Sequence, residues 1–355
     1  MNKIILILIF QLWSNISFSQ NKEEAEKRIK EGVILHDKGN YDAAIVKYNK
    51  ALELDKDNLE ALTEKAFSLY NQQKFSESIN CCKKAIEKHP GDSGLKLVYV
   101  TYGSATDGMN KTEKSLEIYD EGIKMFPTYY PLYFNKGVTL AGDKEYDEAL
   151  LCFQKAIILN PEHASSHNAI ARISSVNNKN IPSLLAYCRF LVIEPKTNRS
   201  VVNFTSMQKI MSGNVKNTGK NSITIYMNPD MFGDTLPNGK PKANSFKTID
   251  LLLSMTAALD FDKKNKKKKE VEKFQRKFET VCAGLKESQK DNYGFFWEYY
   301  APYYIEMYDK KFLETFCYIA FSSTDEAYVS KWLKSHKSEV AKFYEWSNSF
   351  EWKTN

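Results

Sequence analysis

Two histidines have a spacing suited to metal chemistry. His163 and His167 stand four residues apart near an expected helix start, where two imidazoles on one face could bind zinc. No third ligand accompanies them in the sequence, and the surrounding pattern assigns His167 to a packing position. We therefore expect a packed histidine pair, and the sequence indicates no metal site and no cofactor.

A glycine-rich stretch comes close to a phosphate-binding loop. Residues 213–220 run from Gly213 to Gly219-Lys220, but the spacing is one residue too long and Asn221 replaces the hydroxyl residue that such loops need. The motifs H-E-x-x-H, G-x-S-x-G and C-x-x-C are absent from the sequence. Because no convergent acid, base or nucleophile can be named, we expect no catalytic residues and no enzyme.

A lysine-rich run separates two expected helices of the second half. Glu270 and Glu272, which follow it, suit the first turn of a helix, so we expect the lysines in the preceding loop. A solvated loop is the simpler interpretation, and the alternative is a contact for anionic lipid, glycan or nucleic acid. No aromatic residue interleaves the run, which argues against specific nucleic-acid binding. The candidate polyanion contact comprises Lys263, Lys264, Lys266, Lys267, Lys268 and Lys269.

The first 19 residues have the pattern of a secretory signal peptide. Lys3 supplies the positive charge, residues 4–10 form a short apolar run, and Ser17-Phe18-Ser19 gives a small-x-small cleavage pattern. The run is too short to span a bilayer, and no later stretch is apolar enough to do so. We expect cleavage near Ser19/Gln20 and a periplasmic or secreted protein with no transmembrane segment after cleavage.

The elements that must position functional residues follow a sequence repeat. Lys56, Pro90, Pro127, Pro161 and Pro195 close successive units, with spacings of 34, 37, 34 and 34 residues. A period of this size marks an array whose units bury their apolar faces only by stacking. Proline cannot continue a helix and fixes the turn into the next unit, and Lys56 stands where a proline is usual.

Aligned on these positions, the five units share a pattern of small and large residues. Small residues at positions 8 and 20 let two antiparallel helices approach closely, and a larger residue at position 24 fills the space beside them. The eighth position reads Gly32, Ala66, Gly103, Gly137 and Ala171, the twentieth Ala44, Ser78, Ser115, Ala149 and Ser183, and the twenty-fourth Tyr48, Cys82, Tyr119, Phe153 and Tyr187.

This pattern resembles the tetratricopeptide repeat family. The resemblance covers residues 25–197 and is strongest in unit one, residues 25–58, and unit four, residues 130–163. It implies an all-α fold: a right-handed helix-turn-helix solenoid of five repeats, whose first helices line a concave groove for a peptide or a partner helix. Unit five departs from the pattern, because Phe190 stands where a small residue is expected.

The repeat register assigns candidate residues to that groove. Phe67 and Tyr70 would supply apolar contact, asparagines could bond a peptide backbone, and Arg172 could meet an acid. The family's carboxylate clamp is not found in consecutive units, so capture of a free C-terminal carboxylate is not expected. The predicted groove residues are Phe67, Tyr70, Asn71, Thr101, Ser104, Asn135, Val138, Asn168 and Arg172. Alternatively, the C-terminal half of the chain fills the groove.

The register also argues against most disulfides among the six cysteines. Cys81 and Cys152 share position 23 but lie two units apart, and Cys188 is two positions out of phase with Cys152. We expect free, mostly buried thiols. A pair between Cys282 and Cys317 remains open.

Beyond residue 197 the period stops and the charge changes. Residues 1–197 carry 25 basic and 25 acidic side chains, whereas residues 198–355 carry 25 and 19. Helical stripes predict a mostly helical C-terminal domain over 198–355, with one possible lone strand at 223–227 and a first helix that covers the last repeat. Residues 293–352 hold 20 aromatics in 60 positions. They form either a helical core, which is the simpler interpretation, or a platform for sugars or peptides.

Two classes of function follow from these observations. The favoured one is an exported protein–protein interaction scaffold whose groove binds a peptide or helix of a partner. The alternative is a carbohydrate- or envelope-polymer-binding protein, in which the C-terminal aromatics and the lysine run bind and the repeats act as a spacer.

Overall fold

The protein was analysed as a computed structural model that describes residues 21–219, 222–226 and 242–353. The chain divides into two compact units, one up to residue 155 and one from residue 156. The expected signal peptide, residues 1–19, lies outside the described residues.

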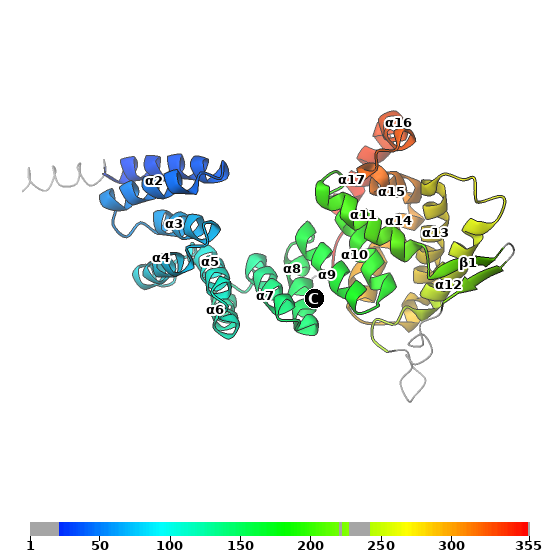
Figure 1. Ribbon diagram of the computed structural model, residues 1–355, viewed down its shortest axis with the longest axis horizontal. Helices are drawn as coiled ribbons and strands as arrows, with labels where there is room; N and C mark the ends of the chain where they lie inside the picture. Colours follow the sequence, from blue (N-terminus) through cyan, green and yellow to red (C-terminus); the bar gives the residue numbers. More distant parts are fainter. Residues whose placement is uncertain (1–20, 220–221, 227–241, 354–355) are drawn as a thin grey trace, which may run out of the picture. The chain divides into compact units, whose positions relative to one another are not determined.

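The first unit is built from successive helix pairs (Figure 1). Each pair corresponds to one predicted repeat, and from α2 to α7 each helix packs against the next along the chain. The helices are one over residues 21–37, α2 (Tyr41–Leu54), α3 (Leu59–Asn71), α4 (Phe75–Lys88), α5 (Leu95–Gly108), α6 (Thr112–Met125), α7 (Tyr130–Gly142) and α8 (Tyr146–Leu159), which runs across the boundary at residue 155.

The predicted packing of small against large residues is confirmed within the repeats. Gly32 and Gly103 lie so close to the rings of Tyr48 and Tyr119 that no Cβ would fit. A Cβ on Gly137 would lie 2.9 Å from the Phe153 ring. Position 8 must therefore stay small because the aromatic side chain at position 24 occupies its space.

The serines at position 20 make an additional bond that recurs in three repeats. Ser78 Oγ donates to the carbonyl of Ala66, and Ser115 Oγ to that of Gly103, both at 2.8 Å. Ser183 Oγ donates to Ala171 O in the fifth repeat, also at 2.8 Å. A buried hydroxyl is thereby satisfied by the position-8 carbonyl of the facing helix.

The turn inside each repeat has one residue in the left-handed region. It is always position 15 of the register, and its φ lies between 53° and 75°. The five residues are Gly39, Gln73, Asn110, Lys144 and Asn178. Only the first is glycine, so four repeats hold a side chain in a backbone conformation that disfavours one.

The second unit contains the fifth helix pair and the C-terminal helices, with one β-hairpin. The predicted strand near residue 223 pairs antiparallel with a preceding strand, so it is not alone. The elements are α9 (Ala164–Val176), α10 (Asn180–Ile193), α11 (Asn198–Met211), β1 (Val215–Gly219), β2 (Ser222–Ile225), α12 (Lys247–Ala258), η2 (Leu259–Phe261), α13 (Glu270–Ser288), η3 (Gln289–Asp291), the π-helical turn η4 (Phe296–Tyr300), α14 (Ala301–Asp309), α15 (Leu313–Ala320), η5 (Phe321–Ser323), α16 (Ala327–Ser335) and α17 (Lys337–Ser349).

Helix α10 forms the centre of the second unit. Every residue from 181 to 192 is buried, unlike the second helices of the earlier repeats, which keep an exposed face. Helices α9, α11, α12 and α15 pack around it (Figure 1). The apolar Phe190, which departs from the repeat pattern, is fully buried here. The C-terminal helices thus cover the apolar outer face of the last repeat.

The C-terminal aromatics are largely core residues of this unit. Tyr299 donates its hydroxyl to Ile157 O at 2.9 Å, and Tyr304 donates to Leu185 O at 2.7 Å. These rings, with Tyr300 and Tyr303, are at most 2% exposed. The interpretation of this segment as an open platform for sugars is therefore wrong, because its tyrosines are buried and bond the last helix of the fourth repeat and the second helix of the fifth.

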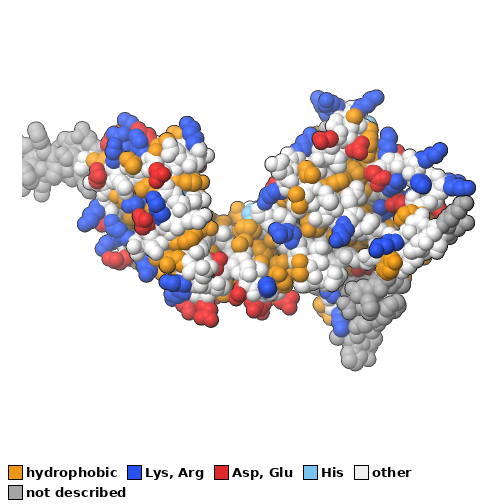
Figure 2. Space-filling view, in the orientation of Figure 1, with side chains coloured by type: hydrophobic (Ala, Val, Ile, Leu, Met, Phe, Trp, Pro, Cys, Tyr) orange, Lys and Arg blue, Asp and Glu red, His pale blue; other side chains and the backbone are white. Residues whose placement is uncertain are grey.

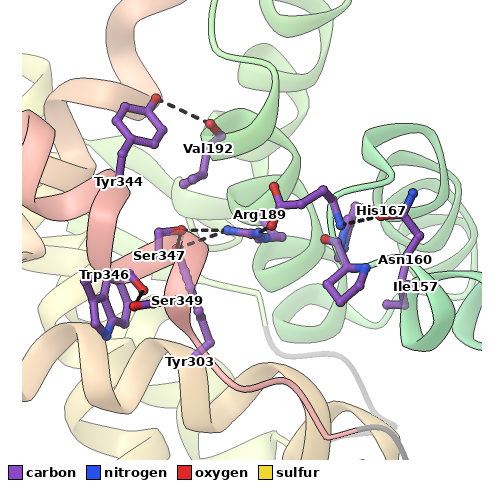
Figure 3. A network of polar contacts seen from close by, with 12 residues as sticks. Ile157, Asn160, His167, Arg189, Val192, Tyr303, Tyr344, Trp346, Ser347 and Ser349 are labelled. Carbon is purple, nitrogen blue, oxygen red and sulfur yellow. Dashed lines mark hydrogen bonds and ion pairs between the residues drawn. The ribbon is translucent and has the colours of Figure 1, made fainter.

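A buried polar network surrounds Arg189 on α10 (Figure 3). The side chain is 0% exposed, and its guanidinium pairs with Glu162 and donates to Ser347 Oγ at 2.9 Å. It also lies 5.1 Å from the ring centre of Tyr303 and 4.9 Å from that of Trp352. The buried cation is accommodated by one carboxylate, hydroxyl groups and aromatic faces.

All six cysteines are free, which confirms the expectation of free thiols for the cysteines of the repeats. Cys282 and Cys317, whose pairing the sequence left open, are both buried thiols, and burial raises the pKa of each. Four of the six are fully buried, so they contribute as small apolar side chains.

Candidate functional site

An aromatic row lies on the first helices of the first two repeats, formed by His36, Phe67 and Tyr70. The His36 and Phe67 rings stack with centroids 4.8 Å apart, and Phe67 and Tyr70 stack at 6.5 Å. Burial lowers the pKa of His36, so its ring stacks in the neutral form at pH 7. Phe67 remains 42% exposed, which leaves a face of the row open to a ligand.

The row continues along one register position. Position 9 of the first four repeats holds Val33, Phe67, Ser104 and Val138, and α5 neighbours both α3 and α7. Val138 is 47% exposed. Apolar side chains therefore reach the surface of the first unit from α3 and α7, with a hydroxyl residue on α5 between them; Figure 2 shows hydrophobic side chains at this unit's surface.

The polar groove residues are partly committed to their own helices. Asn71 Nδ2 donates to Phe67 O at 2.9 Å, and Asn135 Nδ2 donates to Pro131 O at 2.8 Å. Each amide keeps its oxygen for a ligand, whereas Ser104 Oγ already bonds the Tyr119 hydroxyl at 2.9 Å. Because each Asn amide group has two N–H donors and an acceptor oxygen, both asparagines still have one N–H and the oxygen for a peptide backbone.

Thr101 departs from the expected exposure. Its side chain is only 6% exposed, and its hydroxyl donates to Leu97 O at 3.2 Å. Position 6 on α5 is turned into the packing between helices, so Thr101 offers no group to a groove ligand.

Two of the predicted groove residues belong to the second unit. Arg172 on α9 is exposed, and Asn168 on the same helix is half-buried. The Asn168 Oδ1 atom has no hydrogen-bond partner within the described part of the chain. The structure thus divides the predicted set between the two units: seven residues lie on α3, α5 and α7, and two on α9.

The lysine run lies where the sequence placed it, in a turn between η2 and the start of α13 at Glu270. All six lysines are exposed. Lys269 Nζ lies 5.0 Å from the ring centre of Tyr328, and no other aromatic contact of these lysines occurs among the described residues. The run is a solvated surface segment whose contact with a polyanion stays a prediction.

The histidine pair is packed. His167 Nε2 donates to Pro161 O at 2.9 Å, which assigns the tautomer, and Nδ1 accepts from the Tyr300 hydroxyl at 2.7 Å. His163 Nδ1 bonds Ser166 Oγ at 2.7 Å. Since both ring nitrogens of His167 are engaged, this pair cannot bind a metal ion without rearrangement.

Comparison with known proteins assigns the repeats. A profile described as TPR repeat matches residues 32–73, and one described as Tetratricopeptide repeat matches residues 130–163. Residues 32–163 belong to the tetratricopeptide repeat family. The resemblance seen in the sequence is thereby confirmed for these residues.

Curated relatives match part of the chain. Protein STIP1 homolog of Dictyostelium discoideum is 32% identical over 39% of this chain and 30% of its own length. Hsp70-Hsp90 organizing protein of Triticum aestivum is 27% identical over 33% of this chain and 20% of its own length. The chain thus spans less than a third of either relative.

Solved structures resemble part of this chain. A thermophilic TPR protein of Thermus thermophilus has a TM-score of 0.45 and 20% identity, covering 53% of this chain and 98% of that one. Pseudomonas aeruginosa pilF has a TM-score of 0.44 and 18% identity, covering 54% and 90%. Within the described ranges, no helix combines the length and the apolar composition needed to cross a bilayer.

His36 was absent from the predicted groove set. It occupies position 12 of the first repeat, the position that Tyr70 holds in the second. The register therefore contained the signal, and the structure adds the stacking partner that makes His36 part of the surface.

Proposed function

We propose that the protein binds an extended or helical peptide of a partner protein on the first helices of its repeats. The observation that carries this proposal is the aromatic row, where Phe67 stays exposed although it stacks on two rings. Large exposed aromatics beside acceptor groups are typical of sites that anchor a partner side chain. Asn71 and Asn135 would each accept an N–H from the bound peptide.

Peptide display on the immobilised mature chain tests this function. We expect selected peptides to bind by burying an apolar side chain against Phe67, so Phe67→Ala and Tyr70→Ala each weaken affinity at least about tenfold, a typical loss for an interface anchor. Val46→Ala is the control, because Val46 is an apolar residue on α2, a second helix, and is 51% exposed, somewhat more than Phe67. The proposal fails if the selected peptides bind the Phe67→Ala variant as tightly as the original chain.

We also propose that the protein acts outside the cytoplasm. The support is the signal-like pattern of residues 1–19 in the sequence. Mass spectrometry of the protein isolated from its source would then find Gln20 at the amino terminus. A cytosolic chain that retains residues 1–19 would contradict export and leave the peptide-binding proposal unaffected.

The polymer-binding alternative has little support in the fold. Its aromatic component is buried in the second unit, which leaves only the exposed lysine run. An enzymatic role is likewise not proposed, since no acid, base or nucleophile set was identified in the sequence.

A further inference from the structure

A cleft in the second unit lies outside the predicted groove. It has a volume of about 420 Å³ and opens among α15, η5, α16, the start of α17 and the turn after α10. Ser322 Oγ donates to Pro195 O at 3.0 Å, which ties that turn to η5 and closes one wall. The floor is apolar and consists of Pro195, Ile319, Leu333, Val340 and Tyr344.

A second hollow extends this cleft along α16. It is lined by Ala327, Lys331 and Ser335, and it shares Ser330 and Lys334 with the first cleft. The small side chains leave the helix surface accessible. At 1.5 Å per residue, the nine residues of α16 provide a track of about 13 Å, enough for roughly four residues of extended chain. The shape suits a peptide segment better than a compact ion.

The rim of the cleft is positively charged. Lys196, Lys331, Lys334 and Lys337 are all exposed, and no carboxylate lines either hollow. Among the described residues, none of these four ammonium groups has an ion-pair partner. Basic side chains are visible around the tip formed by α16 (Figure 2). The charge that would complement this surface is negative.

An apolar floor with a lysine rim is complementary to a ligand that carries both an apolar group and negative charges. We propose that the cleft binds an acidic segment of a protein partner, with one apolar side chain seated on Leu333 and Val340. Carboxylates on either side of that anchor would pair with Lys334 and Lys337 at one end and with Lys331 at the other. The lysines would attract the acidic segment and fix its position along the cleft. The buried apolar side chain of the segment would provide most of the affinity.

Fluorescence anisotropy with the mature full chain tests this site. The probes are fluorescein-labelled nine-residue peptides with a central leucine flanked by four glutamates, or by four glutamines as the uncharged control. We expect the glutamate peptide to bind and the glutamine peptide to bind at least about tenfold more weakly, with affinity falling as salt rises. Replacing the central leucine by alanine should also weaken binding.

Variants locate the binding on the protein. Lys334→Glu/Lys337→Glu should weaken the glutamate peptide about tenfold or more, and Ser330→Trp, an exposed position shared by both hollows, should block it by filling the track. Lys209→Glu/Lys290→Glu makes the same charge change at two exposed lysines outside the cleft and should leave binding unchanged.

Three results would overturn the proposal. The first is equal binding of the glutamate and glutamine peptides. The second is loss of binding in Lys263→Glu/Lys264→Glu while the cleft variants bind normally, which would place the site at the lysine run. The third is cleft-dependent binding of phosphatidylserine vesicles with no binding of the peptides, which would make the surface a membrane contact.

Discussion

Arg189 is the residue on which the polar contacts of the second unit converge. Its cation is fully buried, whereas the side chain of its carboxylate partner Glu162 is 52% exposed. Removing either partner therefore has unequal consequences. Without Glu162 a charge stays buried with no counter-charge, and without Arg189 the carboxylate is solvated by water while Tyr303 and Ser347 still bond each other at 2.8 Å.

We predict that Glu162→Gln destabilises the second unit more than Arg189→Met does. The expected losses in the free energy of unfolding are about 2 kcal/mol for Glu162→Gln and about 1 kcal/mol for Arg189→Met. The double variant should resemble Arg189→Met alone. Urea unfolding of the four chains measures this cycle, and additive effects would show that the pair does not interact as described.

His167 should make stability depend on pH. Burial, followed by the nearby Arg189 charge, lowers its pKa to about 3, so the folded protein keeps it neutral. Because the unfolded histidine protonates near pH 6.5, stability is complete above that pH and is lost as pH falls towards 3. The loss at pH 5 is about 2 kcal/mol. His167→Gln should be less stable at pH 7 but lose less stability on going to pH 5, and urea titrations at the two pH values check this.

Two further groups influence the same titration. His163 is also held below its usual pKa by burial and acts in the same direction, whereas burial raises the pKa of Asp250 to about 7 and so favours folding at lower pH. The comparison between the original chain and His167→Gln isolates His167 from both. An identical pH dependence in the two chains would contradict the assignment.

At the residue scale, local spacing predicted packing but not long-range partners. The position of His167 in the repeat indicated that it packs, and it does. The burial of Arg189 could not be predicted, because Tyr303, Ser347 and Trp352 lie more than 100 residues further along the chain. Thr101 was wrongly predicted to face the groove, because its position number in the repeat does not specify the rotation of α5 about its own axis.

At the element scale, the turns inside the repeats place one residue at positive φ, a backbone conformation that is strained unless the residue is glycine. Gln73 has φ 60° and Gly39 has φ 75°, at the same position of two repeats. We predict that Gln73→Gly stabilises the first unit by about 0.5 kcal/mol and that Gly39→Ala destabilises it by about 1 kcal/mol. A Cβ on Gly39 would meet no atom within 4 Å, so the second effect is purely conformational.

Chemical denaturation of the two turn variants checks this prediction. The two predicted changes in the free energy of unfolding have opposite signs, so a general effect of substitution at a turn cannot produce both. If both variants destabilise the protein, the side chain of Gln73 contributes a contact that outweighs the strain of its backbone.

Helices were the most predictable elements of the fold. The small–large pattern at positions 8 and 24 predicted the packing inside each repeat. Where position 8 is glycine, the aromatic ring at position 24 occupies the space that a Cβ would need. The serine-to-carbonyl bonds between positions 20 and 8 were not predicted, because small size alone does not distinguish serine from alanine. The strand at 223–227 was predicted without its partner, as β1 is short and polar.

At the scale of the whole molecule, the repeat boundary and the packing boundary differ. The sequence period ends near residue 197, whereas the second compact unit begins at residue 156. The sequence period shows where each repeat begins and ends. It does not show which repeat is covered by other helices. The mostly apolar sequence of α10 was the available signal, and its burial on all sides places the fifth repeat in the core of the second unit.

We predict that fragment 146–353 folds and fragment 198–353 does not. The longer fragment retains α8, α9 and the buried α10, and the shorter one exposes the tyrosines that bond Ile157 and Leu185. Near-ultraviolet circular dichroism and cooperative thermal unfolding distinguish the two. Cooperative unfolding of fragment 198–353 would instead support an independent domain beyond residue 197.

The central claim is that the first helices of the repeats bind a partner peptide. Hydrogen–deuterium exchange of the full chain, with and without a display-selected peptide, tests this claim most directly. We expect slower exchange in α3, α5 and α7, around Phe67 and Val138, when the peptide is bound. Protection confined to residues 198–353, with α3, α5 and α7 unchanged, would contradict it.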